Sequence, residues 1–538
     1  MQIVVPMSGF GERFRRVGYK VPKPLIVVDG KTIIRHIVEM FPGETDFTFI
    51  CNSYHLENED FHMQEILDSA CETGKVVPIA GHKLGPVHTV LQALDHISPD
   101  KPVIVNYADF TCYWDYPEFK YFVKKSGCDG AIPCYRGFHP HTLRSNYYAY
   151  VRERNLVAFD IQEKQPFTDN PVEEYASSGT YYFKSGALMR HYFQDCVDRK
   201  LMVKGEYYVS MAYKAMMDNG CKINVYEVPH FMQWGTPSDL EEYCYWSDIF
   251  KGMLSERPSP KQTGVLLMPM VGLGSRFQIE GYSIPKPLIP VTGKPMAVQA
   301  VNDLPQCESK HYILRRDIEG VESLKKALSD FTDAPEFKVL NGLTDGQATT
   351  CMEGAKGLDL QNPVTIGACD NGLLYDPETF NNFMADTSID VVVWGARGFP
   401  GAMRSPEMYG WIEADDETGE ISSVSVKVPL KDPQKDPIIV GVFTFKRLGD
   451  FINAANRMKS REAKVNGEYY VDMAINDAIE LGLNCKIFEV DKYICWGTPN
   501  DLKTFEYWQT CFHKWQSHPY RLEADKNMQK NSIDSKLF

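Results

Sequence analysis

Residues 6–31 read PMSGFGERFRRVGYKVPKPLIVVDGK, and residues 269–294 read PMVGLGSRFQIEGYSIPKPLIPVTGK. The two stretches align without a gap at a constant offset of 263 residues, and 16 of their 26 positions are identical. Unrelated segments of this length share about one or two positions, because common residues each occur at roughly 5–10%. The chain therefore contains a duplicated unit, and the repeated part is a glycine loop followed by an arginine and a lysine.

The duplication extends along both halves of the chain. GEYYVSMA at 205–212 matches GEYYVDMA at 467–474, and QWGTPSDL at 233–240 matches CWGTPNDL at 495–502, both at an offset of 262. Such a small drift in offset indicates small loop insertions within a common core. The segment ERPSPKQ at 256–262 has the proline-rich, polar composition of a linker. We therefore expect a first domain at 1–254, a linker at 255–262, a second domain at 263–520 and a polar tail at 521–538.

Composition narrows the class of protein. A chain of 538 residues exceeds one hydrophobic core, and its net charge of −14 argues against nucleic acid or an anionic membrane as the main partner. The first residues, MQIVVPM, are typical of a strand rather than a signal peptide, and no apolar run approaches the ~20 residues of a membrane span. The 14 cysteines contain no CxxC pair, which favours reduced thiols over disulfides or a zinc site. We expect a cytoplasmic protein.

Short apolar runs alternate with helical patterns in each half. QIVVPM, TFICN, PVIVNYAD and DGAIPCY are typical of strands, whereas KTIIRHIVEMF at 31–41 places its isoleucines on one face of a helix. This alternation predicts an α/β fold with a mainly parallel sheet covered by helices on both faces. Such sheets bind ligands at the carboxyl ends of their strands, where we expect the glycine loop, Asp109 and Asp370 to converge.

The glycine loop has the residues of a phosphate site. Gly9 and Gly11 lack Cβ, so the main-chain N–H groups can approach an anion, and the planar guanidinium of Arg13 can grip phosphate oxygens. Lys23 stands between two prolines that hold it at a defined place. A lone GxG is ordinarily only a turn, but the full GxGxRF…GYxxPKPL pattern is far more specific. The second copy repeats the set in Gly272, Gly274, Arg276 and Lys286.

The chain resembles the sugar-phosphate nucleotidylyltransferase family, in the branch that makes activated precursors for capsule and surface polysaccharides. The resemblance rests on the GxGxRF…PKPL loop, an aspartate after a middle strand, the EK pair in FDIQEKQPF and the late GTPxDL segment, and it covers essentially 1–250 and 264–515. It implies two tandem Rossmann-like (GT-A-like) nucleotidyltransferase domains, each a mainly parallel mixed sheet flanked by helices. It also implies attack by a substrate phosphate on the α-phosphorus of a nucleoside triphosphate, with Mg²⁺ as cofactor and pyrophosphate as product.

The resemblance assigns roles to the residues of the first loop and of the middle strands. Asp109 and Asp370 are the expected Mg²⁺ ligands, a role that suits a strand-end carboxylate. The expected catalytic residues are Arg13, Lys23, Arg276 and Lys286, which would neutralise charge that develops at phosphorus. The expected loops around the base supply Gly85, Thr89, Gly346, Gln347 and Thr350. Asp115 and Asp376 also recur, and we interpret them as helix caps.

The acceptor side differs between the copies. Glu163 and Lys164 match the EK pair of the family, which reaches the sugar and phosphate of the substrate, whereas the second half keeps Lys427 but has Val426 before it. The remaining expected acceptor-site positions are Gly179 and Gly441, which mark a close backbone approach, and Glu206 and Glu468, which either hold a substrate hydroxyl or are helix N-terminal charges. The pairs Arg144–Ser145 and Arg404–Ser405 meet either the acceptor phosphate or a surface salt bridge.

One departure from the family concerns the metal. Family members often carry a second metal-binding aspartate just before the GT of the late motif, where this chain has Gln233-Trp234 and Cys495-Trp496. Mg²⁺ would then be held by one aspartate and the phosphates, and a cysteine is a poor ligand for this ion.

The leading hypothesis is a tandem nucleotidylyltransferase that transfers a nucleoside monophosphate to a phosphorylated small molecule, a sugar phosphate in the first place. The alternative is one catalytic half and one nucleotide- or product-binding regulatory half. A glycosyltransferase would require a DxD motif, but Asp109 is followed by Phe-Thr and Asp370 by Asn-Gly. The expected partners are an NTP and the phosphorylated substrate, with no nucleic acid and no membrane. The sequence leaves the nucleotide, the acceptor and the oligomeric state open, a homo-oligomer included.

Overall fold

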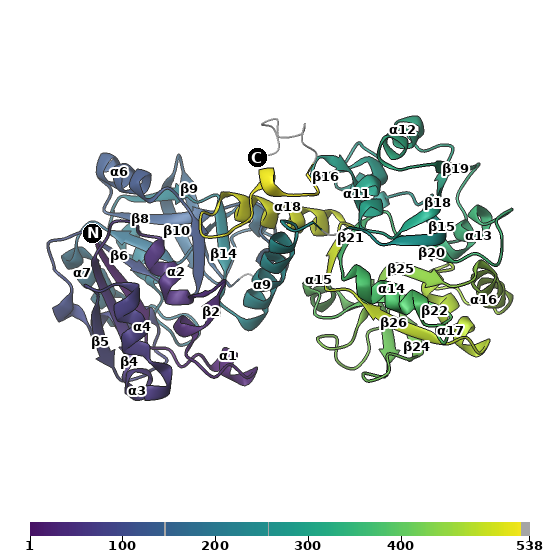
Figure 1. The fold of residues 1–538 in the computed structure, drawn as a ribbon. Helices are drawn as coiled ribbons and strands as arrows, with labels where there is room; N and C mark the ends of the chain where they lie inside the picture. The colour runs from purple at the N-terminus through teal and green to yellow at the C-terminus, as the bar shows by residue number, and fades with distance from the viewer. Residues whose placement is uncertain (145–146, 257, 529–538) are drawn as a thin grey trace. The chain divides into compact units, whose positions relative to one another are not determined.

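The computed structural model describes residues 1–144, 147–256 and 258–528, so Ser145 and most of the expected tail lie outside the described residues. The chain divides into two compact units (Figure 1). Unit 1 comprises Met1–Ser247 and Lys514–His518, and unit 2 comprises Asp248–His513 and the chain from Pro519. Within the described ranges no helix has the length and apolar character needed to cross a membrane.

Unit 1 is built on a ten-stranded sheet in the order β11-β9-β10-β13-β8-β12-β6-β1-β4-β5. Its strands are β1 (Gln2–Met7), β4 (Asp46–Asn52), β5 (Lys75–Ile79), β6 (Val103–Asn106), β8 (Gly130–Tyr135), β9 (Ala149–Arg154), β10 (Val157–Glu163), β11 (Tyr175–Ser177), β12 (Thr180–Phe183) and β13 (Ile223–Glu227). Parallel pairing is confined to β6-β1-β4-β5 and to β8–β13. The α/β class and the mixed character of the sheet are confirmed. The parallel part is smaller than expected, because β12 runs antiparallel between β6 and β8 and β9–β10 form an antiparallel pair.

Helices flank this sheet. They are α1 (Glu12–Arg16), α2 (Ile33–Glu39), α3 (Ser53–Glu57), α4 (Met63–Ala70), α5 (Pro86–Leu91), α6 (Tyr116–Ser126), α7 (Gly186–Asp198), α8 (Val209–Asp218) and α9 (Pro237–Gly252). The predicted amphipathic helix is confirmed as α2, whose Ile33, Ile34 and Ile37 are fully buried. The Asp115 side chain caps α6 by accepting a hydrogen bond from Glu118 N at 2.8 Å, as predicted.

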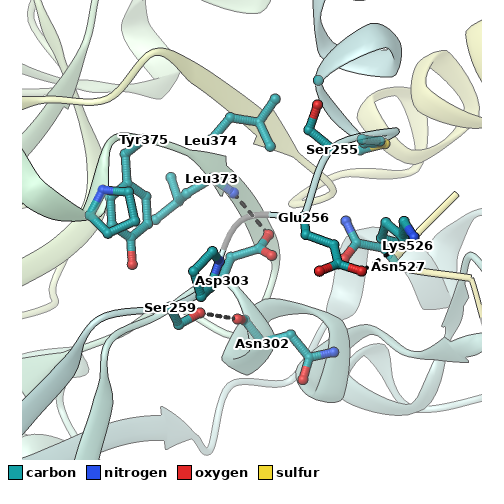
Figure 2. A pocket seen from close by; sticks show the side chains of 14 residues that line it. Ser255, Glu256, Ser259, Asn302, Asp303, Leu373, Leu374, Tyr375, Lys526 and Asn527 are labelled. Atoms are coloured by element: carbon teal, nitrogen blue, oxygen red, sulfur yellow. Dashed lines mark hydrogen bonds and ion pairs between the residues drawn. The ribbon is translucent and has the colours of Figure 1, made fainter.

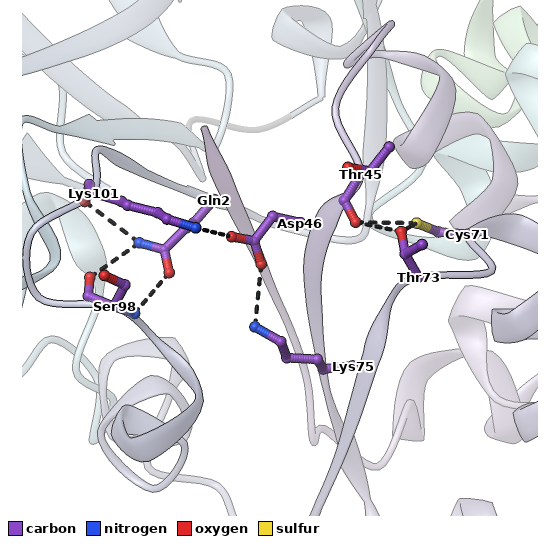
Figure 3. Close-up of polar contacts among 8 residues, drawn as sticks. All are labelled: Gln2, Thr45, Asp46, Cys71, Thr73, Lys75, Ser98 and Lys101. Atoms are coloured by element: carbon purple, nitrogen blue, oxygen red, sulfur yellow. Dashed lines mark hydrogen bonds and ion pairs between the residues drawn. The ribbon is translucent and has the colours of Figure 1, made fainter.

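Side-chain contacts fasten the amino-terminal ends of the strands in unit 1 (Figure 3). The Gln2 amide accepts a hydrogen bond from Ser98 N at 2.7 Å and donates to Ser98 O at 3.1 Å. Asp46 lies 3.2 Å from Lys75 Nζ and 3.4 Å from Lys101 Nζ. This edge of the sheet therefore carries structural contacts, whereas ligand sites in such sheets lie at the opposite, carboxyl-terminal edge.

A short segment from the end of the chain completes unit 1. The indole ring of Trp515 lies 5.4 Å from the ring of His36 and 6.5 Å from that of Trp234, measured between centroids. The Ser247 hydroxyl lies 3.1 Å from His518 Nε2. Unit 1 is therefore discontinuous in sequence, a feature that the repeat pattern did not indicate.

Unit 2 contains a second sheet in the order β19-β18-β15-β20-β25-β22-β26, with β23 and β24 paired beside it. Its strands are β15 (Lys261–Met270), β18 (Gln306–Arg315), β19 (Pro335–Leu340), β20 (Val364–Ile366), β22 (Val391–Ala396), β23 (Gly410–Ala414), β24 (Ile421–Val426), β25 (Ile438–Phe445) and β26 (Cys485–Glu489). This order repeats the path β5-β4-β1-β6-β12-β8-β13 of unit 1. The second sheet is also mixed, because β25 runs antiparallel to both β20 and β22.

The helices of unit 2 follow the same plan. They are α10 (Ser275–Ile279), α11 (Met296–Asn302), α12 (Val321–Phe331), α13 (Gln347–Gly354), α14 (Pro377–Ala385), α15 (Pro400–Arg404), α16 (Leu448–Ser460), α17 (Val471–Glu480) and α18 (Pro499–Lys514). Asp376 caps α14 by accepting from Thr379 N at 2.9 Å, which confirms its predicted role. Each unit has its own hydrophobic core.

Candidate active site

The glycine loop and Asp109 meet at one edge of the sheet in unit 1, because β1 and β6 are parallel neighbours. Lys23 Nζ lies 3.1 Å from Asp109 Oδ2 and donates a hydrogen bond to the Gly235 carbonyl at 3.4 Å. The same ammonium lies 5.6 Å from the centroid of the Phe14 ring. Three sequence motifs, the loop lysine, the strand-end aspartate and the late glycine, thus converge on one point.

Unit 2 repeats this contact. Lys286 Nζ lies 2.5 Å from Asp370 Oδ2 and 2.9 Å from the Gly497 carbonyl, and it lies 5.7 Å from the Phe277 ring centroid. Burial opposes the charge on Lys286, but the neighbouring Asp370 carboxylate outweighs it and raises the pKa of the ammonium. Lys286 is therefore positively charged at neutral pH.

The predicted phosphate loop has a backbone conformation that favours glycine at one position in each copy. Gly11 and Gly274 adopt φ angles of 63° and 64° immediately before α1 and α10, a region in which side chains other than glycine are disfavoured. A Cβ on Gly9 or Gly272 would meet open space. Among the described residues, none of the polar contacts joins Arg13 or Arg276 to the lysine–aspartate pairs, and both guanidinium side chains are exposed.

The predicted metal ligand directly precedes a short two-stranded ribbon in each unit. In unit 1 the ribbon consists of β7 (Phe110–Tyr113) and β14 (His230–Gln233), and in unit 2 of β21 (Asn371–Leu374) and β27 (Lys492–Cys495). The ribbon places the main chain of the late motif beside the aspartate: Trp234 N donates to Asp109 O, and Trp496 N donates to Asp370 O, both at 2.9 Å.

Asp109 and Asp370 do not belong to a larger cluster of metal-ligating side chains among the described residues. Within the part of the chain that the structure describes, no group of three or more His, Cys, Asp or Glu side chains could hold a metal ion. Burial raises the pKa of the Cys495 thiol well above its usual range. Mg²⁺ is commonly held by one or two carboxylates together with substrate phosphates, and a lone aspartate fits that minimal requirement.

The predicted base loop is fastened to the GEYY segment by main-chain contacts. Gly85 has φ 88° and directly precedes α5, and Tyr207 N donates to Leu84 O at 2.9 Å. A Cβ on Gly85 would lie 2.8 Å from both the N and the O atom of Tyr207. Gly346 has the same relation to the main chain of Tyr469. Glycine is therefore required here by close packing, which the sequence pattern did not reveal.

Thr89 connects the base loop to the glycine loop. Its hydroxyl lies 2.7 Å from Ser8 Oγ and 3.2 Å from His82 Nε2, two partners that the sequence did not single out. Thr350 is also buried and bonds to a neighbouring threonine hydroxyl at 2.6 Å. Gln347 is half-buried at the start of α13. The two threonines thus hold the loops in place, whereas the Gln347 side chain has no such anchor among the residues that the structure describes.

The EK pair and the GEYY segment form one polar network in unit 1. Ser210 Oγ donates to Glu163 Oε2 at 2.7 Å, and burial raises the pKa of Glu163 to about 7. Lys164 has a φ of 59°, a left-handed conformation that is rare for a lysine, and its ammonium donates to the Tyr208 hydroxyl. Tyr208 in turn donates to Glu206. Strained residues of this kind concentrate at functional sites.

Unit 2 retains part of this network. Lys427 also has a φ of 59°, and its ammonium lies 5.6 Å from the Tyr470 ring centroid. Burial and the adjacent Glu468 carboxylate raise the pKa of the Tyr470 hydroxyl to about 12. Val426 ends β24, where Glu163 ends β10.

The two glycines expected near the acceptor both lie against neighbouring groups. Gly179 has φ 94°, and a Cβ there would lie 3.1 Å from the Phe110 ring. Gly441 has φ 77°, and its Cβ would lie 3.3 Å from that of Ala368.

The late GTPxDL motif has a structural function at the start of α9. Thr236 Oγ1 donates to Asp239 Oδ2 at 2.6 Å, and Asp239 N donates back to Thr236 Oγ1 at 3.2 Å, which is a reciprocal helix cap. Arg144 lies 3.0 Å from Glu242 and 3.8 Å from Asp239, so it forms the ion pairs that were one of its two alternatives.

A cavity of about 330 Å³ lies elsewhere in unit 2, and none of the predicted site residues lines it (Figure 2). Two polar contacts lie in the lining of this cavity. Asp303 accepts a hydrogen bond from Leu373 N at 3.0 Å, and Lys526 lies 3.4 Å from Glu256. Burial raises the pKa of Asp303 to about 7. The cavity is therefore separate from the lysine–aspartate site.

Comparison with known proteins finds similarity over part of the chain. A mannose-1-phosphate guanyltransferase from Neurospora crassa is 26% identical over 196 residues, which are 35% of this chain and 51% of that protein. The catalytic subunit beta of a mannose-1-phosphate guanylyltransferase from Xenopus tropicalis is 24% identical, again over 196 residues that are 35% of this chain and 51% of that protein. The chain thus spans about half the length of these curated relatives.

The solved structure of a nucleoside-diphosphate-sugar pyrophosphorylase from Vibrio cholerae RC9 is 20% identical with a TM-score of 0.38, over 45% of this chain and 98% of its own. Residues 4–251 match the family described as Nucleotidyl transferase, so this part of the chain is similar to that family.

Proposed function

We propose that the protein transfers a nucleoside monophosphate from an NTP to a phosphorylated small molecule, a sugar phosphate, and releases pyrophosphate. The observation that carries the proposal is the contact between Lys23 and Asp109 at the carboxyl edge of the sheet, beside the glycine loop. The family match over residues 4–251 supports the reaction, and the names of the two guanylyltransferase relatives support a sugar phosphate as acceptor.

In the proposed reaction an oxygen of the acceptor phosphate attacks the α-phosphorus of the NTP. The bond from that phosphorus to the bridging oxygen of the β-phosphate breaks, and pyrophosphate leaves. The N–H groups around Gly9 and Gly11 and the charges of Arg13 and Lys23 would stabilise the triphosphate. Asp109 would hold Mg²⁺ together with phosphate oxygens, and the ion would supply further positive charge to the reacting phosphates.

The acceptor would bind to the network at the end of β10. Glu163 would accept a hydrogen bond from a hydroxyl of the acceptor, and Lys164 would bind its phosphate. The left-handed backbone at Lys164 and the bonds through Tyr208 to Glu206 hold this ammonium in one place, which favours a defined substrate position.

We further propose that residues 1–254 and 263–520 are two tandem domains of this kind. The repeated strand order and the second contact, between Lys286 and Asp370, support the duplication. The alternative, a regulatory second half, is favoured by one observation: Val426 replaces the glutamate of the EK pair. All 14 cysteines are free thiols, which supports the cytoplasm as the location.

The test is a pyrophosphate-release screen of CTP, UTP, dTTP and GTP against a panel of phosphorylated sugars and polyols. The full chain would be compared with its Asp109→Ala and Asp370→Ala variants, and with Asp115→Ala as a control that removes a helix cap only. We expect Asp109→Ala to abolish most of the pyrophosphate release supported by unit 1 and Asp115→Ala to leave kcat unchanged. Unchanged turnover in the Asp109→Ala variant would refute the assignment of unit 1 as the catalyst.

A further inference from the structure

The two copies differ at three positions that touch one another beside the EK pair. In unit 1 these positions hold Glu163, Ala149 and Ser210. Glu163 is paired with Ala149 across the β9–β10 ladder, and Ser210 on α8 donates its hydroxyl to the Glu163 carboxylate at 2.7 Å. A single carboxylate, which belongs to the strand, thus lies between the strand and the helix.

Unit 2 has Val426, Gly410 and Asp472 at the same three positions. Val426 is paired with Gly410 across the β23–β24 ladder, as Glu163 is with Ala149. Asp472 stands in the first turn of α17, at the place of Ser210 in the aligned GEYYV segments. The strand has therefore lost its carboxylate and the helix has gained one.

Gly410 provides the space for this exchange. A Cβ at Gly410 would overlap with Oδ2 of Asp472 and would lie 3.1 Å from the Ile439 side chain. The carboxylate thus occupies the volume that a larger residue at position 410 would fill. In unit 1 the residue at this place, Ala149, has a Cβ, and the helix position holds Ser210, whose side chain is shorter than that of aspartate by one atom. The three differences are consequently coupled by packing.

The surroundings of Asp472 are those of a ligand-binding carboxylate. It is partly exposed, and among the described residues no other side chain donates a hydrogen bond to it. The positive charge of Lys427 opposes the rise in the pKa of Asp472 that burial causes, and the negative charge of Asp472 helps to raise the pKa of the Tyr470 hydroxyl. Carboxylate, left-handed lysine and tyrosine are the groups that Glu163, Lys164 and Tyr208 provide in unit 1.

We propose that unit 2 contains a second acceptor site, in which Asp472 replaces the missing glutamate and accepts a hydrogen bond from a hydroxyl of a phosphorylated sugar or polyol. This inference rests on the proposed nucleotidyl transfer. Lys427 binds the phosphate of the acceptor. Because the carboxylate now projects from the helix instead of the strand, the second site selects a hydroxyl at a different position from the one that Glu163 selects, and the two units take different acceptors.

The experiment uses the full chain with unit 1 silenced by Asp109→Ala, so that the remaining pyrophosphate release reports unit 2. The probes are mannose 1-phosphate, glucose 1-phosphate, ribitol 5-phosphate and glycerol 3-phosphate, with the NTP that supports turnover. Adding Asp472→Asn keeps the shape of the side chain but removes its charge. We expect the KM for the acceptor to rise at least tenfold, whereas the KM for the NTP stays within twofold. Asp450→Asn, which changes an aspartate in the first turn of α16, is the matched control and should change neither constant.

A transplant of the unit 1 residues gives an independent readout. Gly410→Ala alone should weaken acceptor binding, because the new Cβ displaces the Asp472 carboxylate. The triple variant Gly410→Ala, Val426→Glu, Asp472→Ser should restore turnover and shift the acceptor preference of unit 2 to that of unit 1. A thermal melt of each variant confirms that the loss in the single variant is not unfolding.

Three results would overturn the inference. The first is an Asp472→Asn variant with an acceptor KM within twofold of its parent. The second is a triple variant no more active than Asp472→Ser alone. The third is a wild-type chain that releases pyrophosphate although the Asp109→Ala variant has no residual release that a further Asp370→Ala change removes. Unit 1 would then be active, but unit 2 would have no acceptor site. If the wild-type chain releases no pyrophosphate with any pair of substrates, the proposed function itself fails.

Discussion

Replacing Gly85 by alanine tests whether close packing of the base loop on the GEYY segment is essential. Gly85 has φ 88° and ψ 176°, a region that is essentially restricted to glycine and costs a side chain about 1–3 kcal/mol. The added Cβ would also lie 2.8 Å from the main chain of Tyr207, and such overpacking costs about 1–3 kcal/mol more. We therefore expect Gly85→Ala to lower the free energy of unfolding by about 2–6 kcal/mol.

Gly137→Ala is the matched control. Gly137 has nearly the same φ, 90°, but a Cβ there meets nothing within 4 Å, so only the backbone term of about 1–3 kcal/mol applies. Urea denaturation of the full chain, followed by tryptophan fluorescence, measures both free energies. The KM for the NTP measures the displacement of the loop, and it should rise for Gly85→Ala only. Equal destabilisation by the two substitutions, together with equal KM values, would show that the contact with Tyr207 does not constrain the loop.

Three further predictions concern charged groups. Because burial raises the pKa of Glu163 to about 7, the KM of unit 1 for its acceptor should increase as the pH falls below 7, and Glu163→Gln should abolish this dependence; a pH-independent KM in the wild type would contradict the role of Glu163. Asp115→Ala should lower the free energy of unfolding by about 1 kcal/mol with no change in kcat, and a change in kcat would contradict its assignment as a cap only. Asp303 has a pKa raised from 3.8 to about 7, so the folded state binds its proton more tightly than the unfolded state, and stability falls as the pH rises between these values. Asp303→Asn should therefore be more stable than the wild type at pH 8, by up to about 4 kcal/mol, and equally stable near pH 3, as thermal melts at both values can show.

The fold class and the meeting of the loop with Asp109 follow from the sequence, because apolar runs mark the strands and each motif directly follows one of them. The direction of the later strands does not follow, since a buried run such as β12 has the same composition whether its neighbours are parallel or antiparallel to it. The sequence also showed that Val426 replaces a glutamate. Only the structure reveals its neighbours: the register of β23 on β24 pairs Val426 with Gly410, and Asp472 on α17 lies against Gly410.

The left-handed backbone conformation at Lys164 and Lys427 could not be predicted from the sequence either. A lysine carries no signal for positive φ, and its conformation is imposed by the surrounding strand and by the main-chain bond to Tyr148 or Tyr409. The anchoring of Thr89 to Ser8 depends on two loops that meet only after the sheet has formed. Local pattern therefore predicted the elements and the charged residues, whereas contacts between distant segments had to come from the structure.

The return of Trp515 to unit 1 has a consequence for the order in which the protein is made. More than 260 residues separate Ser247 from Trp515, and a ribosome that adds about 5–20 residues per second needs roughly 13–54 s to cover that distance. During this interval the aromatic surface formed by His36 and Trp234 lacks its last partner. Unit 1 is begun first but receives its last segment only after residues 248–513 of unit 2 have been made, so a chain that terminates early leaves unit 1 unfinished even when every residue up to Ser247 is present.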